Sequence, residues 1–182
     1  MDRPNLFGEV SPELKMSRAW NMPNSQTFSI PHLRKFVDRY TDREKVIVDP
    51  FAGNCEIGTI TNDLNPDTKA KYHMKAHDFL QMLVNQGVKS DVVLFDPPYS
   101  PRQITECYAG VGLRTTQKDT QSSFYTELRG MVRALVKPGG FVLSFRWNST
   151  GVGKDGFTML EILLVAHGGS HNDTICVAQQ KL

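Results

Sequence analysis

Val92-Val93-Leu94-Phe95-Asp96-Pro97-Pro98-Tyr99 joins an apolar run to a carboxylate, two prolines and an aromatic ring. A short, uninterrupted apolar run is typical of a strand that is buried on both faces of a parallel sheet. The prolines end the strand and leave Asp96 and Tyr99 at the carboxyl edge of the sheet, where open α/β sheets bind their ligands. The alternative is a capped turn without a function, because Asp-Pro pairs also occur in ordinary turns.

Outward from this strand, the sequence alternates between strand and helix patterns, which indicates an α/β fold. Pro31 opens the first helix, at a position where its missing N–H costs nothing. Strands that alternate with helices form a mostly parallel sheet, and a short glycine-containing turn joins the last two strands into an antiparallel hairpin. Strands are predicted over 46–48, 59–61, 72–75, 91–95, 141–145, 161–166 and 174–178, and helices over 31–40, 78–85 and 124–136.

Two stretches lack such a pattern. Residues 1–30 are interpreted as an N-terminal arm, because prolines, asparagines and scattered aromatics follow no period there. Residues 100–123 form a long polar segment that is at most partly helical and directly follows Tyr99. Loops of this length are uncommon unless they are functional or disordered, so we expect this one to contact the substrate. A plain solvated loop is the alternative, since its acidic residues offset its basic ones.

Composition limits the chain to a single domain over residues 1–182. With 40% hydrophobic and 22% charged side chains, 182 residues build one core and leave no room for a second full domain. The net charge of +2 permits contact with nucleic acid without requiring it. Three isolated cysteines argue against a zinc site or a disulfide framework. No apolar run is long enough to span a membrane, so we expect a cytoplasmic protein without a membrane partner.

Several motifs, taken in order, resemble those of the S-adenosylmethionine-dependent DNA amino-methyltransferases. VIVDPFAG (46–53) resembles their cofactor loop, TNDLNP (61–66) their second acidic motif and DFL (78–80) their third, while residues 96–99 match the DPPY motif of the N6-adenine type. NSQTFSIP (24–31) is similar to the motif that precedes the cofactor loop. The resemblance covers most of residues 25–182. It implies a class I, Rossmann-like methyltransferase fold whose helix after the cofactor loop is shortened.

The resemblance also implies a binding site for the cofactor S-adenosylmethionine. Gly53 lets the backbone approach a ligand closely, and Asp63 at the end of the next strand can accept both ribose hydroxyls. Asp78 could accept a hydrogen bond from the adenine amino group with Phe79 beside the ring, unless it is only a helix N-cap. Asp49 could orient the loop or face the cationic end of the cofactor. The expected cofactor-binding residues are Phe28, Ser29, Asp49, Pro50, Phe51, Ala52, Gly53, Asp63, Leu64, Asp78, Phe79 and Asp96.

The expected catalytic residues are Asp96, Pro97, Pro98 and Tyr99. If the Asp96 carboxylate and the Pro97 carbonyl each accept one N6–H of adenine, the amine lone pair is freed to attack a methyl group. The rigid prolines present the carbonyl, and Tyr99 stacks on a base that has left the duplex. In the resembling family Asp in the first position favours adenine, whereas Ser favours cytosine. Trp147 is a further candidate for the base pocket, with a core position as the alternative.

The cofactor loop departs from the family pattern. Asp49 and Asp63 are 14 positions apart (63 − 49), against about 20 when a full helix follows the glycine loop. Cys55 stands where the family usually has a second glycine. These departures keep open a reading in which the cofactor pocket is degenerate.

The chain is also short for an enzyme that selects its own target sequence. We therefore expect DNA as the partner, with recognition that is brief or that comes from a homodimer or a separate specificity subunit. One alternative is an RNA base methyltransferase, because compact class I enzymes that act on ribosomal RNA also carry an Asp-Pro-Pro-Tyr motif. Another is a catalytically silent subunit that binds nucleic acid for an active partner. His167 and His171 flank the terminal turn and lack a third ligand, so no metal is expected.

Overall fold

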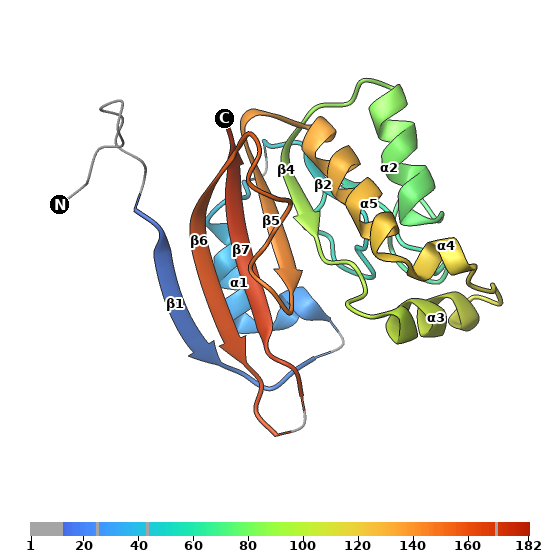
Figure 1. The fold of residues 1–182 in the computed structure, drawn as a ribbon, viewed down its shortest axis with the longest axis horizontal. Helices are drawn as coiled ribbons and strands as arrows, with labels where there is room; N and C mark the ends of the chain where they lie inside the picture. Colours follow the sequence, from blue (N-terminus) through green and yellow to red (C-terminus); the bar gives the residue numbers. More distant parts are fainter. Residues whose placement is uncertain (1–12, 25, 43, 170) are drawn as a thin grey trace.

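The computed structural model describes residues 13–24, 26–42, 44–169 and 171–182, and the described strands form one seven-stranded sheet (Figure 1). The order across the sheet is β1-β6-β7-β5-β4-β2-β3. β7 is antiparallel to both of its neighbours, and every other neighbouring pair is parallel. The strands are β1 (Lys15–Trp20), β2 (Ile47–Asp49), β3 (Ile60–Thr61), β4 (Ser90–Phe95), β5 (Val136–Arg146), β6 (Phe157–Ala166) and β7 (Thr174–Lys181).

β4 lies in the middle of the parallel part, between β2 and β5, as its apolar run predicts. Because successive side chains of a strand point to opposite faces, Val92 and Leu94 pack in one core cluster and Val93 and Phe95 in the other. Helix α1 (Pro31–Asp38) covers the first face, and α2 (Ala76–Asn85) and α5 (Ser122–Leu135) cover the second (Figure 1). The sheet is therefore a central layer with apolar cores on both sides.

The segment 100–123 is partly helical, as the sequence indicated. It holds α3 (Pro101–Gly110) and α4 (Gln117–Thr120), and residues 111–116 between them are not helical. Ser100 caps α3, because its hydroxyl accepts the Gln103 N–H at 3.2 Å, and Pro101 occupies the first turn. A capping box between Thr116 and Asp119 starts α4.

The N-terminal arm also contains a strand that the sequence analysis did not predict. β1 runs parallel to β6 at the edge of the sheet, with Lys15 opposite Glu161. All six of its residues are exposed or only partly buried, so backbone pairing rather than an alternating apolar pattern defines it. The arm continues into a short 3-10 helix, η1 (Thr27–Ser29), which directly precedes α1. Residues 1–12 of the predicted arm lie outside the described residues.

Other predicted elements differ from the structure in length, and one is reduced to a single bridge. Residues 50–59, between β2 and β3, contain no helix, in agreement with the short spacing that the sequence shows, and the shortening is complete. The strand predicted over 72–75 is reduced to a single bridge between Asn62 and Tyr72. β5 begins at Val136, five residues before the strand predicted over 141–145, and its pairing with β4 shifts register between Ser90 and Val92. In the part of the chain that the structure describes, no helix combines the length and the apolar character needed to cross a membrane.

Candidate active site

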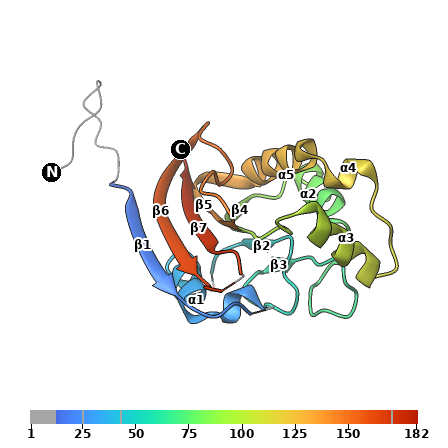
Figure 2. The same cartoon turned by 60° about the horizontal axis from the view of Figure 1, so that its bottom comes forward.

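The carboxyl ends of the parallel strands meet at one edge of the sheet. In Figure 1 the arrowheads of β1, β4, β5 and β6 point toward the bottom, and Figure 2 turns this edge toward the reader. A cavity of about 880 Å³ opens there. Its walls come from η1, the loop after β2, the Asp96–Tyr99 segment, α3, α5 and the turn between β6 and β7. Its volume falls in the range of about 300–1,000 Å³ that small-molecule sites occupy.

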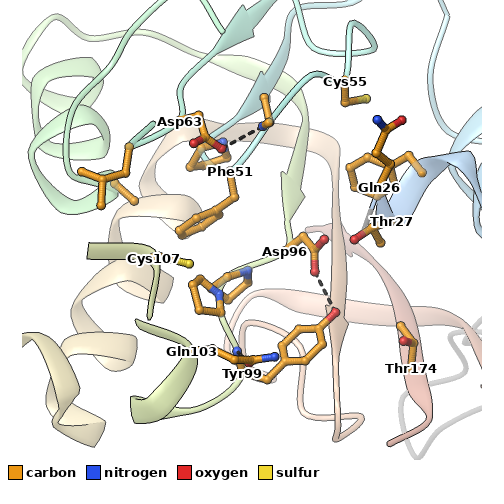
Figure 3. A pocket seen from close by; sticks show the side chains of 18 of the residues that line it. Gln26, Thr27, Phe51, Cys55, Asp63, Asp96, Tyr99, Gln103, Cys107 and Thr174 are labelled. Carbon is orange, nitrogen blue, oxygen red and sulfur yellow. Dashed lines mark hydrogen bonds between the residues drawn. The ribbon is translucent and has the colours of Figure 1, made fainter. Parts of the chain in front are cut away.

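Asp96 lies at the floor of this cavity, immediately after β4 (Figure 3). The Tyr99 hydroxyl donates a hydrogen bond to Asp96 Oδ1 at 2.7 Å, and the Thr27 side chain lines the same cavity. Burial raises the pKa of Asp96 to about 6, although the hydrogen bond from Tyr99 and the polar Thr27 side chain favour the charged form. The carboxylate is therefore held in place and titrates near neutrality.

The backbone after Asp96 is fixed by side chains from two helices. Gln103 Oε1, from α3, accepts the Tyr99 N–H at 2.7 Å, and the Tyr125 hydroxyl, from α5, donates to the Pro98 carbonyl. Among the described residues, no donor is hydrogen-bonded to the Pro97 carbonyl. The Tyr99 ring packs against Trp147 with a centroid separation of 5.5 Å. The cavity thus offers a carboxylate and a free carbonyl side by side in the sequence, together with two aromatic rings.

A second polar pair lies at the ends of β2 and β3. Gly53 N–H donates to Asp63 Oδ2 at 2.8 Å (Figure 3), and Asn65 N–H donates to Oδ1 at 2.9 Å. Gly53 has a φ of +53°, which glycine adopts at little cost. Both Gly53 and Asp63 line the cavity, so a carboxylate with remaining acceptor capacity is presented to a ligand.

Asp49 lies beneath the loop rather than at the cavity surface. Its side chain is fully buried, Oδ1 accepts the Phe51 N–H at 3.1 Å, and Oδ2 has no hydrogen-bond partner among the described residues. Burial raises the pKa of Asp49 to about 8, and the nearby charges of Asp96 and Asp63 add to this effect. Asp49 is therefore hydrogen-bonded to the loop at Phe51 and is not among the cavity-lining residues, and its role toward a ligand stays a prediction.

Comparisons with known proteins give the fold. No protein-family model and no curated protein matches the chain. Among solved structures, SMU.776, which is named as a methyltransferase and was solved with SAH, is 13% identical, with a TM-score of 0.57 over 82% of this chain and 48% of its own. TrmN from Thermus thermophilus is 18% identical, with a TM-score of 0.54 over 84% and 49%. The chain has a class I, Rossmann-like methyltransferase fold.

This chain spans about half the length of SMU.776 and of TrmN. A protein from Clostridium thermocellum that is named as an rRNA-methylase matches over its whole chain and 88% of this one, with 9% identity and a TM-score of 0.53. Identities this low establish a common architecture alone. The methyltransferase fold nevertheless agrees with the fold class that the sequence predicts.

Within this methyltransferase fold, most of the predicted site residues line one cavity. The residues that do so are Phe28, Ser29, Pro50, Phe51, Ala52, Gly53, Asp63, Leu64, Asp96, Pro97, Pro98 and Tyr99. Asp78 and Phe79 do not. Helix α2 begins at Ala76, which places Phe79 in the core and leaves the Asp78 side chain 66% exposed beside His77. The N-cap of α2 is Lys75, so Asp78 is not the cap either, and Lys75 and Ala76 line the cavity instead.

Several cavity residues were not predicted. Thr27, Gln103 and Tyr125 touch the catalytic segment. Thr27 lies within the motif over 24–31, whereas Gln103 and Tyr125 carry no local signal of this role. Trp147 lines the cavity, which agrees with the prediction of a pocket position rather than a core position. The terminal turn also reaches the cavity, through His167, His171, Asn172 and Thr174. No sequence pattern links that turn to β4, because the contact depends on the order of the strands in the sheet.

Proposed function

We propose that the chain is an S-adenosylmethionine-dependent methyltransferase that modifies the exocyclic N6 of adenine in DNA. The observation that carries the proposal is the Asp96 carboxylate with the unpaired Pro97 carbonyl beside it, at the carboxyl end of β4 and in a cavity of about 880 Å³. An amine with two N–H groups needs two neighbouring acceptors, and this segment supplies them.

The residues present fit the cofactor. Asp63, which two backbone N–H groups hold at the cavity wall, suits a ribose diol, and the glycine at residue 53 lets the backbone approach a ligand. Pro50–Gly53, Leu64, Phe28 and Ser29 would complete the binding site. When bound, S-adenosylmethionine supplies a methyl group attached to a positively charged sulfur.

The role of the chain is then to prepare the amine and to exclude water. The exocyclic nitrogen of adenine is a poor nucleophile, because its lone pair is delocalised into the ring. Hydrogen bonds from its two N–H groups to Asp96 and Pro97 draw electron density onto the nitrogen. The Tyr99 hydroxyl donates to Asp96 Oδ1, and the carboxylate keeps further acceptor sites for the amine. The Tyr99 ring, which Trp147 supports, then stacks on a base that has left the helix.

An RNA base is the second candidate substrate. TrmN and the protein named as an rRNA-methylase share this fold, and the acceptor pair at Asp96 and Pro97 does not distinguish adenine in RNA from adenine in DNA. A silent subunit is the third candidate, and the helix-free loop between β2 and β3 favours it.

Dependence on a homodimer or on a separate specificity subunit remains a prediction. A cytoplasmic location also remains a prediction.

Transfer of a labelled methyl group to unmodified duplex DNA, and in parallel to total RNA, separates these candidates. We expect labelled N6-methyladenine in the DNA, and its loss in Asp96→Asn, which keeps the shape but removes the charge. Asp155→Asn is the matched control, because the Asp155 side chain is 93% exposed and lies outside the cavity. Label in RNA alone would favour the second candidate. Absence of both SAH binding and methyl transfer would favour the third, whereas SAH binding without transfer to either polymer would indicate that a partner is required.

A further inference from the structure

Two helices hold a single peptide group of the catalytic segment. The Pro98 carbonyl and the Tyr99 N–H belong to the same peptide plane, which is rigid because of its partial double bond. Tyr125 from α5 donates to the carbonyl, and Gln103 from α3 accepts the N–H at 2.7 Å. The plane is therefore gripped at both of its polar atoms by side chains from separate elements.

This grip bears on the neighbouring Pro97 carbonyl. β4 fixes the chain as far as Phe95, and the rings of Pro97 and Pro98 lock φ at both positions. Once the 98–99 plane is also held, little torsional freedom remains between Asp96 and Tyr99. The Pro97 carbonyl, which has no donor among the described residues, lies between the two fixed ends. Its direction then depends on the side chains that hold the plane.

We propose that Gln103 and Tyr125 act as a clamp that aims the Pro97 carbonyl at the substrate amine. Both are positioning residues, since each acts through the backbone and neither is required to touch the reacting atoms. The catalytic part of this inference rests on the proposed function. Misplacement of a catalytic group by about 1 Å can lower a rate by roughly 100-fold, which gives such a clamp a measurable effect.

Arg146, at the end of β5, and Trp147, which follows it, pack against the residues of the clamp and of the catalytic segment. Arg146 Cζ lies 4.9 Å from the centroid of the Tyr125 ring, and the next residue, Trp147, packs against Tyr99. Packing and a cation–π contact hold the Tyr125 ring, and neither of them involves the hydroxyl. Removal of the hydroxyl alone should leave the ring in place, so Tyr125→Phe is a clean test.

Amide exchange of Tyr99 tests the clamp without any activity. Tyr125→Phe leaves the acceptor of the Tyr99 N–H intact, yet it frees the other end of the same plane. We expect exchange of the Tyr99 amide to become at least about tenfold faster, measured by NMR on protein labelled with [15N]tyrosine. Tyr40→Phe is the control, because it removes a hydroxyl bonded to Glu161 Oε2 at 2.9 Å, outside the cavity. An unchanged rate in Tyr125→Phe would overturn the clamp.

Kinetics test its catalytic role. For Tyr125→Phe and Gln103→Leu we expect kcat to fall about tenfold, with the KM for nucleic acid and the affinity for SAH within about twofold. Gln103→Glu keeps an accepting oxygen and should restore most of kcat. The double variant should lose less than the product of the two single losses, because both residues hold one plane. A raised KM with unchanged kcat would instead make Tyr125 a binding contact. If the unaltered protein modifies neither DNA nor RNA, the proposed function fails, and amide exchange still decides the clamp.

Discussion

Asp96 accepts a hydrogen bond from an amine most strongly when it is ionised, and burial raises its pKa to about 6. Below this pH the carboxyl group is protonated and one of its oxygens becomes a donor. We therefore expect kcat/KM for methyl transfer to rise with pH, about tenfold per pH unit below 6, and to level off above it. A rate profile between pH 5 and 8 measures this.

Tyr99 provides a control on that assignment. Its hydroxyl favours the charged form of Asp96, so Tyr99→Phe should move the inflection to higher pH. Tyr40→Phe, which changes a tyrosine far from the cavity, should leave the inflection where it is. A profile that is flat from pH 5 to 7 would show that Asp96 does not control the rate.

Asp49 predicts a pH dependence of stability rather than of rate. Its pKa is about 8 in the folded protein and about 4 in the unfolded chain, so the folded state binds the extra proton between these values. Stability from this group is present at low pH and is lost as pH rises. We expect the free energy of unfolding to fall by about 1.4 kcal/mol per pH unit between pH 4 and 8, relative to Asp49→Asn. Urea denaturation measures this free energy at each pH. If the assignment is wrong, the unaltered protein and Asp49→Asn should show the same pH dependence of the free energy of unfolding.

Individual site residues were predictable where one local motif fixes them. Gly53 and Asp63 could be paired from the sequence, because a glycine loop and the end of the next parallel strand always lie at the same edge. Asp78 and Phe79 could not be placed, because a shift of two residues in the start of α2 turns one side chain to solvent and the other into the core. Tyr125 and Gln103 gave no local signal, since their roles depend on how two helices dock beside β4.

Among the elements, β6 is linked to the N-terminal part by one buried carboxylate. Glu161, which is 3% exposed, accepts two hydrogen bonds from Arg39 and one from Tyr40, and lies 3.8 Å from Lys15 of β1. We expect Glu161→Ala to lower the free energy of unfolding by about 2–3 kcal/mol, because charged donors lose their acceptor. Urea denaturation measures the change.

The control for that prediction is an exposed ion pair of similar geometry. Asp38 accepts from Arg34 at 2.7 Å within α1, and both side chains are about half exposed. Asp38→Ala should therefore cost less than about 0.5 kcal/mol. Equal losses at Glu161 and Asp38 would contradict the linking role of Glu161.

Elements with a strong period were predictable and the others were not. The apolar run over residues 92–95 predicts the strand β4, and the helical spacing of apolar residues after Pro31 predicts the helix α1. β1 is polar and exposed, so only its pairing with a strand far along the chain reveals it. Helix α3 was missed although Ser100 and Pro101 form a standard start signal, because its polar surface weakens the apolar period.

For the molecule as a whole, binding of the demethylated cofactor should appear as increased stability. A ligand at 100 times its Kd adds about 2.7 kcal/mol, which for a chain of this size raises Tm by roughly 5–10 °C. We expect SAH to produce such a shift by thermal denaturation, and Asp63→Ala to abolish it. Asp67→Ala, an exposed residue in the same loop, should keep it. A single transition in the same scan would support one domain over residues 1–182.

The pairing of β1 with β6 also determines when the site can form during synthesis. His167, which follows β6, is hydrogen-bonded to Asn21 across 146 positions of the chain. A ribosome that adds about 5–20 residues per second needs roughly 7–30 s to make that interval. Throughout it, the first strand has no partner in the sheet, and the turn that carries Thr174 to the cavity wall does not yet exist. A growing chain therefore completes the site only after β6, β7 and the turn between them have been made.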